Sequence, residues 1–128
     1  MRLLLDTHTF LWWLDGDAAL SAAAQFAIAE AQNEVFLSSA SAWEIATKFR
    51  LGKLPDATAI ATDVAGAAAA QGFAELPISL RHGERAGALP GPHRDPFDRM
   101  LVAQAILEDL FLVSNEQAFD AYGVRRLW

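Results

Sequence analysis

The 128-residue sequence contains no cysteine. Disulfides, thiolate zinc sites, iron–sulfur clusters and a cysteine nucleophile are therefore excluded. The sequence also lacks an apolar run approaching the ~20 residues of a membrane span. Its start turns acidic at Asp6, too early for a secretory signal peptide. We therefore expect a protein of the reducing cytoplasm with no membrane partner.

Basic residues are scarce, with 10 Lys and Arg against 16 Asp and Glu, a net charge of −6. Proteins that hold nucleic acids by charge alone usually show the opposite balance. A nucleic-acid substrate would therefore need a local basic patch or bound metal ions. At 53% hydrophobic and 20% charged residues, the composition is that of a folded protein, and the length predicts one domain over residues 1–128.

Short apolar runs alternate with helical patterns along the whole chain. The expected strands are Leu3–Leu5, Val35–Leu37, Phe73–Ile78, Leu110–Ser114 and Val124–Trp128. The expected helices are Thr7–Leu14, Ser21–Gln32, Ser41–Leu51, Pro55–Gln71, Ser79–Ala88 and Asp95–Asp109, with a helical turn over Asn115–Ala121. This alternation predicts the α/β class, as a three-layer α/β/α sandwich around a central, mainly parallel sheet.

Several acidic residues follow the predicted strands, at the carboxyl ends where functional sites of parallel sheets lie. Asp6 follows the first strand, Glu44 lies early in the helix after the second, and Glu116 follows the fourth. Asp95 and Asp98 begin the helix that leads into the fourth strand. Crowded carboxylates repel one another unless a cation binds them, and oxygen-only ligands favour Mg²⁺ or Mn²⁺. Such a site suits phosphoryl chemistry.

Each acid also has a structural explanation. Asp6, Asp95 and Glu116 stand where helix caps are expected, and Asp98 completes an acidic first turn. Glu44 can pair with Lys48 one turn later. The joint placement of the acids at one edge is what favours the functional interpretation.

Four segments resemble a known family. Residues 4–8 read LLDTH, residues 38–48 read SSASAWEIATK, residues 93–105 read HRDPFDRMLVAQA, and residues 112–124 read LVSNEQAFDAYGV. Together they resemble PIN-domain toxins of the VapC type over nearly the whole chain. The resemblance implies a PIN-like fold and a Mg²⁺- or Mn²⁺-dependent endoribonuclease. Such an enzyme is the toxin of a bacterial toxin–antitoxin pair and is commonly a homodimer.

The resemblance also assigns roles to residues. Asp6, Glu44 and Asp98 fall on the family's main acidic positions, as catalytic residues and metal ligands. Glu116 takes the fourth position, commonly an aspartate, and its longer side chain favours a water-mediated role. Asp95 then caps its helix or supports the site.

Further residues surround these acids in the sequence. The hydroxyls of Thr7, Ser38 and Ser114 are candidates for orienting the acids, and each is equally an ordinary cap. Lys48 and Arg99 are candidates for binding substrate phosphates, with solvated surface charge or pairing with nearby acids as the alternative. We assign no catalytic role to His8 or His93.

The expected partners are an RNA substrate and a cognate antitoxin protein. Phe10, Trp13 and the alanine-rich helices are candidates for a groove that holds an antitoxin helix. Two other functions stay open on the residues alone. One is a PIN-fold binding module with weak or no catalysis, and the other is a different metal-dependent nuclease or phosphatase.

Overall fold

The structure is a computed structural model that describes residues 1–128, and its centre is one five-stranded sheet. The strands run in the order β3-β2-β1-β4-β5, and every neighbouring pair is parallel. They are β1 (Arg2–Leu5), β2 (Glu34–Ser38), β3 (Ala74–Leu76), β4 (Phe111–Val113) and β5 (Arg126–Leu127). The predicted parallel sheet is confirmed, and it brings the carboxyl ends of β1, β2 and β4 to one edge.

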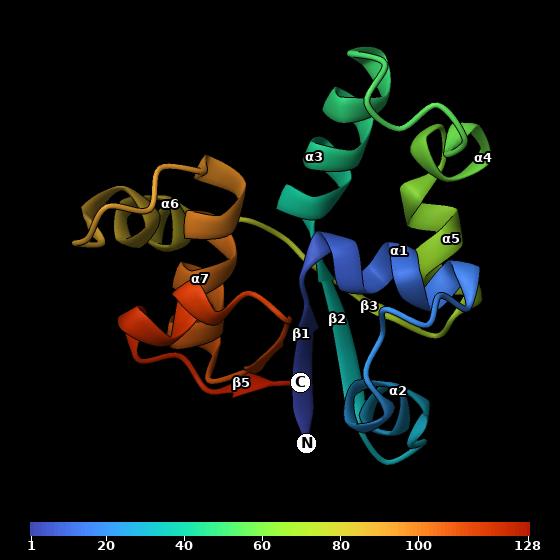
Figure 1. The fold of residues 1–128 in the computed structure, drawn as a ribbon. Helices are drawn as coiled ribbons and strands as arrows, with labels where there is room; N and C mark the ends of the chain where they lie inside the picture. Colours follow the sequence, from blue (N-terminus) through green and yellow to red (C-terminus); the bar gives the residue numbers. More distant parts are fainter.

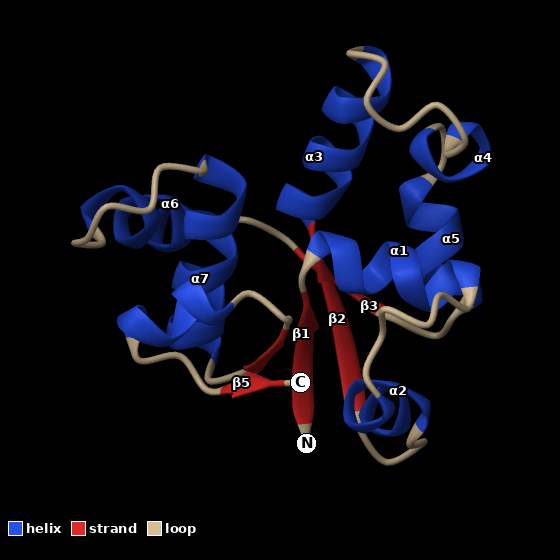
Figure 2. Cartoon of the chain, viewed as in Figure 1, coloured by secondary structure: helices blue, strands red, loops and turns tan.

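Helices cover both faces of this sheet (Figures 1 and 2). They are α1 (Thr7–Asp15), α2 (Ala22–Ala29), α3 (Ser39–Arg50), α4 (Thr58–Ala61), α5 (Val64–Ala70), α6 (Leu80–Ala88), α7 (Pro96–Glu108) and the 3₁₀ helix η1 (Gln117–Tyr122). Helices α6, α7 and η1 lie on one side of β1, and α1, α2, α4 and α5 lie on the other. None of these helices is long and apolar enough to cross a membrane.

The central strand β1 explains the two-sided packing. Its three leucines are fully buried, and consecutive side chains point to opposite faces. Leu3 and Leu5 belong to a core cluster with residues of α1, α2 and α5, whereas Leu4 packs in a second cluster against α7 and η1. A strand that is apolar at every position therefore fits the middle layer of a sandwich.

Two expectations are wrong on the side of the sheet covered by α1, α4 and α5. The single helix predicted from Pro55 to Gln71 is two short helices, α4 and α5, because Asp63 leaves the helical conformation and its side chain accepts from Gly66 N. Phe10 cannot line a groove for a partner, because it is fully buried with its ring 6.2 Å from that of Phe73.

Candidate active site

Asp6 is fixed at the carboxyl end of β1 by two donors. Its Oδ1 accepts from the backbone N–H of Thr9, at 2.8 Å, as the N-cap of α1. Its Oδ2 accepts a short hydrogen bond from the hydroxyl of Ser114, which follows the neighbouring strand β4. Asp6 is therefore both a cap and a buried carboxylate, so the structural and functional interpretations of this residue do not exclude each other.

Glu44 is a buried acid held from two directions. It lies in α3, which begins directly after β2, and it is only 3% exposed. Thr7, the residue after Asp6, donates to Oε1 at 2.6 Å, and Lys48 Nζ donates to Oε2 at 2.5 Å. A buried carboxylate needs such partners. The Thr7 bond joins the end of β1 to the helix that follows β2.

Asp98 completes the acidic group from the far side. It lies in the first turn of α7, where Asp95 is the N-cap and accepts from the N–H groups of Phe97 and Asp98. Burial raises the pKa of Asp98; a hydrogen bond from His93 opposes this, and the charges of Asp95 and Glu44 raise the pKa further. Helices α3 and α7 pack together at this point, with the rings of Trp43 and Phe97, the neighbours of Glu44 and Asp98, 4.8 Å apart.

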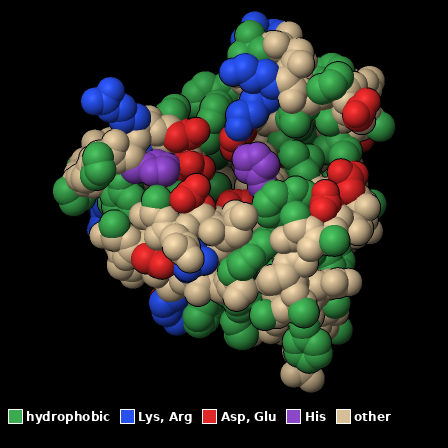
Figure 3. Space-filling model, viewed as in Figure 1, with side chains coloured by type: hydrophobic (Ala, Val, Ile, Leu, Met, Phe, Trp, Pro, Cys, Tyr) green, Lys and Arg blue, Asp and Glu red, His purple; other side chains and the backbone are tan.

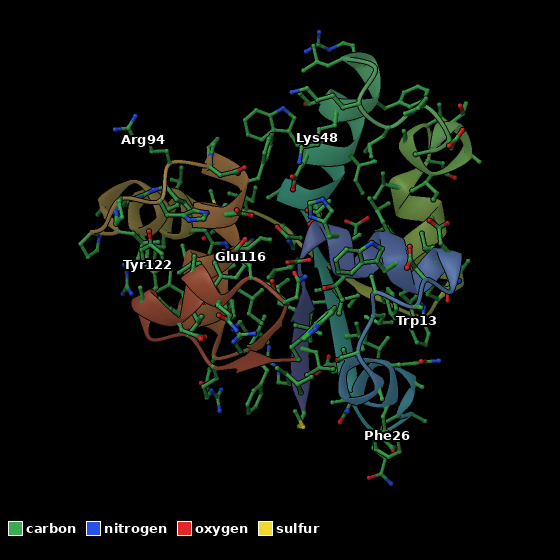
Figure 4. All side chains as sticks on the ribbon, viewed as in Figure 1. Trp13, Phe26, Lys48, Arg94, Glu116 and Tyr122 are labelled. Atoms are coloured by element: carbon green, nitrogen blue, oxygen red, sulfur yellow. The ribbon has the colours of Figure 1, made fainter.

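Glu116 lies at the open rim of the same edge. It is exposed, it caps η1 by accepting from Ala118 N, and its own N–H donates to the Ser114 hydroxyl at 3.0 Å. Ser114 therefore connects the backbone of Glu116 to the carboxylate of Asp6. Figure 4 shows Glu116 in the central part of the view, on the side of the site opposite Lys48.

Acidic side chains gather on one face of the molecule. In Figure 3, Asp and Glu side chains gather around a hollow in the middle of the face, with Lys and Arg side chains of α3 directly above. Lys48 is the member of this basic group that contacts an acid of the site.

The remaining predicted residues divide into two groups. Thr7 and Ser114 donate to acids, as expected of orienting hydroxyls. Ser38 instead donates to Gln104 Oε1 of α7 at 2.5 Å while capping α3, and it contacts none of the acids. Arg99 turns inward, and its guanidinium donates to the carbonyls of Ala86, Gly87, Leu89 and His93.

Sequence reasoning missed the contribution of His93. Its Nε2 lies 2.9 Å from Asp98 Oδ2, and its carbonyl is held by Arg99. The sequence shows only that His93 ends a proline-rich stretch and lies five residues before Asp98. This spacing does not predict a contact between the two side chains, because the contact depends on the conformation of the loop.

The carboxylates of Asp6, Glu44 and Asp98 are the type of ligand, and carry the charge, that suits a hard divalent cation. The acids of β1, α3 and α7 offer only carboxylate oxygens, the ligands preferred by Mg²⁺ and Mn²⁺. Burial and neighbouring acids raise the pKa of Asp98, and a bound cation would favour its charged form. However, no three acidic or histidine side chains lie close enough together to form a ready-made ion site in this arrangement.

Comparisons with known proteins agree with this fold. A family model described as "PIN domain" matches residues 3–124. Among solved structures, VapBC2 from Rickettsia felis, bound to a DNA fragment from its promoter, superposes with a TM-score of 0.72 at 16% identity, covering 98% of this chain and 97% of that one. A toxin–antitoxin complex from Klebsiella pneumoniae gives a TM-score of 0.51 at 16% identity, covering 93% and 90%. No curated protein sequence matches this chain.

Proposed function

Since this chain belongs to the PIN domain family, whose members are typically nucleases, we propose that it is a metal-dependent endoribonuclease. Asp6, Glu44 and Asp98 would hold Mg²⁺ or Mn²⁺. When bound, the ion supplies an activated water and stabilises the charge on the attacking and leaving oxygens. The substrate would be the phosphodiester backbone of RNA.

The observation that carries this proposal is the packing that brings together the three elements bearing Asp6, Glu44 and Asp98. Thr7, adjacent to Asp6, donates to Glu44, and the rings of Trp43 and Phe97, adjacent to Glu44 and Asp98, lie 4.8 Å apart. Buried like charges cost stability, and groups of this kind are common at functional sites. The acids would therefore bind a cation in addition to the helix caps that Asp6 and Glu116 form.

The protein's own groups would hold this arrangement ready. Ser114 and the Thr9 N–H fix both oxygens of Asp6, and Thr7 fixes one oxygen of Glu44. His93 holds Asp98. Glu116 is exposed at the rim and one step away from Asp6 through Ser114, so it suits contact with the site through water.

We also propose that the protein is the toxin of a bacterial toxin–antitoxin pair, acting in the cytoplasm as a homodimer. The two solved structures above are toxin–antitoxin complexes, and this supports an antitoxin partner. A cavity of about 240 Å³ between α1 and α4, lined by apolar residues such as Leu11 and Ile60 and by the charged Asp15, Lys53 and Asp56, is a candidate contact point for an antitoxin segment. Co-expression with the protein encoded next to this chain, followed by co-purification, tests the pairing.

The test of the nuclease is Asp6→Asn, assayed on RNA with Mn²⁺ and with EDTA. Asparagine is as good an N-cap as aspartate, so α1 should remain intact while the charge is lost. The matched control is Asp15→Asn, which removes an exposed acid from the same helix. We expect Mn²⁺-dependent cleavage in the parent and the control and none in Asp6→Asn. Cleavage by Asp6→Asn at the parent's rate refutes the assignment.

A further inference from the structure

A second cavity lies next to the proposed site, since His93 lines it and contacts Asp98, and the proposed nuclease assigns it no role. It is about 470 Å³, and it is bounded by residues 90–93 and by Ala118, Ala121 and Tyr122 of η1. The other principal cavities measure between about 120 and 290 Å³. This one, called here the loop–η1 cavity, is therefore the one large enough for the usual small-molecule range of about 300–1,000 Å³.

The walls of the loop–η1 cavity suit a flat, partly apolar ligand. Pro90, Pro92 and the two alanines give apolar surface, and the rings of His93 and Tyr122 stand almost perpendicular to each other, at 89° with centroids 6.4 Å apart. The two rings pack against each other, and His93 also packs against Phe119 at 5.9 Å, so a planar ligand stacks on the parts of these rings that are still exposed.

Unused hydrogen-bonding groups line the same walls. The backbone N–H groups of Gly91 and His93 donate to no protein acceptor. The Tyr122 hydroxyl is buried without a partner. It lies against Gly91, where an added Cβ would be 3.3 Å from the hydroxyl oxygen. Buried hydroxyls are nearly always paired, and this one becomes available to a ligand only if the loop at Gly91 moves away from it.

The cavity is joined to the proposed reaction site by one side chain. His93 is a wall of the cavity, and its Nε2 lies 2.9 Å from Asp98 Oδ2. Arg94 follows His93 in the same loop, is exposed, forms no ion pair, and extends outward from the molecule (Figure 4). A ligand in the cavity therefore contacts His93, which binds a carboxylate of the proposed metal site, and the next residue of the loop, Arg94, is an exposed cation without an ion-pair partner.

We propose that the loop–η1 cavity binds a nucleobase of the RNA substrate, next to the phosphate presented to the acidic site. A base has apolar faces for the proline, alanine and aromatic walls, and a polar edge for the N–H groups and the Tyr122 hydroxyl. Its attached phosphate suits Arg94. This inference rests on the proposed function for the identity of the substrate as RNA.

The experiment uses nucleosides, which carry a base and no phosphate, so that neither metal nor cleavage is involved. The full chain, ¹⁵N-labelled and in EDTA, is titrated with adenosine, guanosine, cytidine and uridine, and with ribose as the probe without a base. We expect saturable shifts at Gly91, His93 and η1 with at least one nucleoside and none with ribose. Equal responses to ribose, or no response to any nucleoside, overturn the proposal.

Two matched substitutions on η1 localise the binding. Ala121→Phe fills the cavity from an exposed position, whereas Gln117→Phe adds the same ring to η1 outside the cavity lining. We expect Ala121→Phe to weaken nucleoside binding about tenfold, the effect of losing one base-stacking contact, and Gln117→Phe to bind as the parent does. Equal binding by both variants overturns the proposal. Ala118→Phe replaces Ala121→Phe if thermal unfolding shows that the latter is not folded.

Tyr122→Phe tests the hydroxyl alone. We expect weaker binding of the preferred nucleoside with no change in the fold; unchanged binding means that the hydroxyl is not used and overturns that part of the proposal. Nucleoside binding without RNA cleavage would contradict the proposed nuclease activity and support base binding in the cavity. RNA cleavage without nucleoside binding would contradict only the base-binding role of the cavity.

Discussion

The pairing of Glu44 with Lys48 can be tested by removing the lysine. Lys48→Met keeps the apolar stem of the side chain but leaves a carboxylate that is 4% exposed with Thr7 as its one remaining side-chain partner. Losing a hydrogen bond to a charged group costs about 1.5–3 kcal/mol, and breaking a fully buried ion pair costs about 3–5 kcal/mol. Because Lys48 itself is 31% exposed, the lower range applies, and we expect a loss of about 2 kcal/mol.

This loss is large enough to measure by thermal unfolding. At about 2.1 cal/mol/K per residue, the 128 residues give an unfolding entropy of about 0.27 kcal/mol/K. A loss of about 2 kcal/mol then lowers Tm by about 7 °C. The measurement is made in EDTA, so that no metal ion compensates for the missing lysine.

Two further variants are controls for the expected loss of stability in Lys48→Met. Arg50→Met removes an exposed cation from the same helix and should change Tm by little. Glu44→Gln combined with Lys48→Met removes the stranded charge and should recover most of the loss. A Lys48→Met protein as stable as the parent, or a double variant no more stable than the single one, would refute the reasoning that Glu44 is a buried charge held by Lys48.

Other predictions follow from the same site. Because burial raises the pKa of Asp98, the folded protein binds a proton at the Asp98 carboxyl group more tightly than the unfolded chain does. The stability of the folded protein therefore falls as the pH rises from the usual pKa of an aspartate through the raised pKa of Asp98. Asp98→Asn in EDTA should therefore be more stable than the parent at neutral pH, with the difference shrinking in acid; a less stable variant at pH 7 contradicts this. Ser114→Ala removes a donor from Asp6 and should lower Mn²⁺ affinity about 10–100-fold, measured by calorimetry; unchanged affinity contradicts the orienting role. Tyr122→Phe removes a buried, unpaired hydroxyl and should raise stability by about 1 kcal/mol in denaturant titrations; destabilisation means that the hydroxyl has a partner.

Local patterns in the sequence were sufficient to predict most of the fold. The run of three leucines in β1 reports burial on both faces, and the caps Asp6, Ser21 and Asp95 act on N–H groups two or three residues away. Such signals depend on neighbours in the chain. The break at Asp63 was missed because the alanine-rich stretch after it favours helix strongly enough to hide the cap.

The contacts within the site depend on tertiary packing and were harder to foresee. The parallel sheet was enough to predict that Asp6, Glu44 and Glu116 belong to one edge. It did not specify that Ser38 would bond to Gln104, that Arg99 would bind backbone carbonyls, or that His93 would reach Asp98. Each of these contacts depends on how α6, α7 and the loop before α7 pack together.

The most direct test of the central claim is anomalous diffraction from crystals grown with Mn²⁺. The proposed function predicts an anomalous peak coordinated by carboxylate oxygens of Asp6 and Asp98, with Glu44 bound directly or through water, and no such peak in crystals of Asp6→Asn. A Mn²⁺ peak away from these residues, or none at saturating Mn²⁺, would contradict the claim that these carboxylates form a metal site.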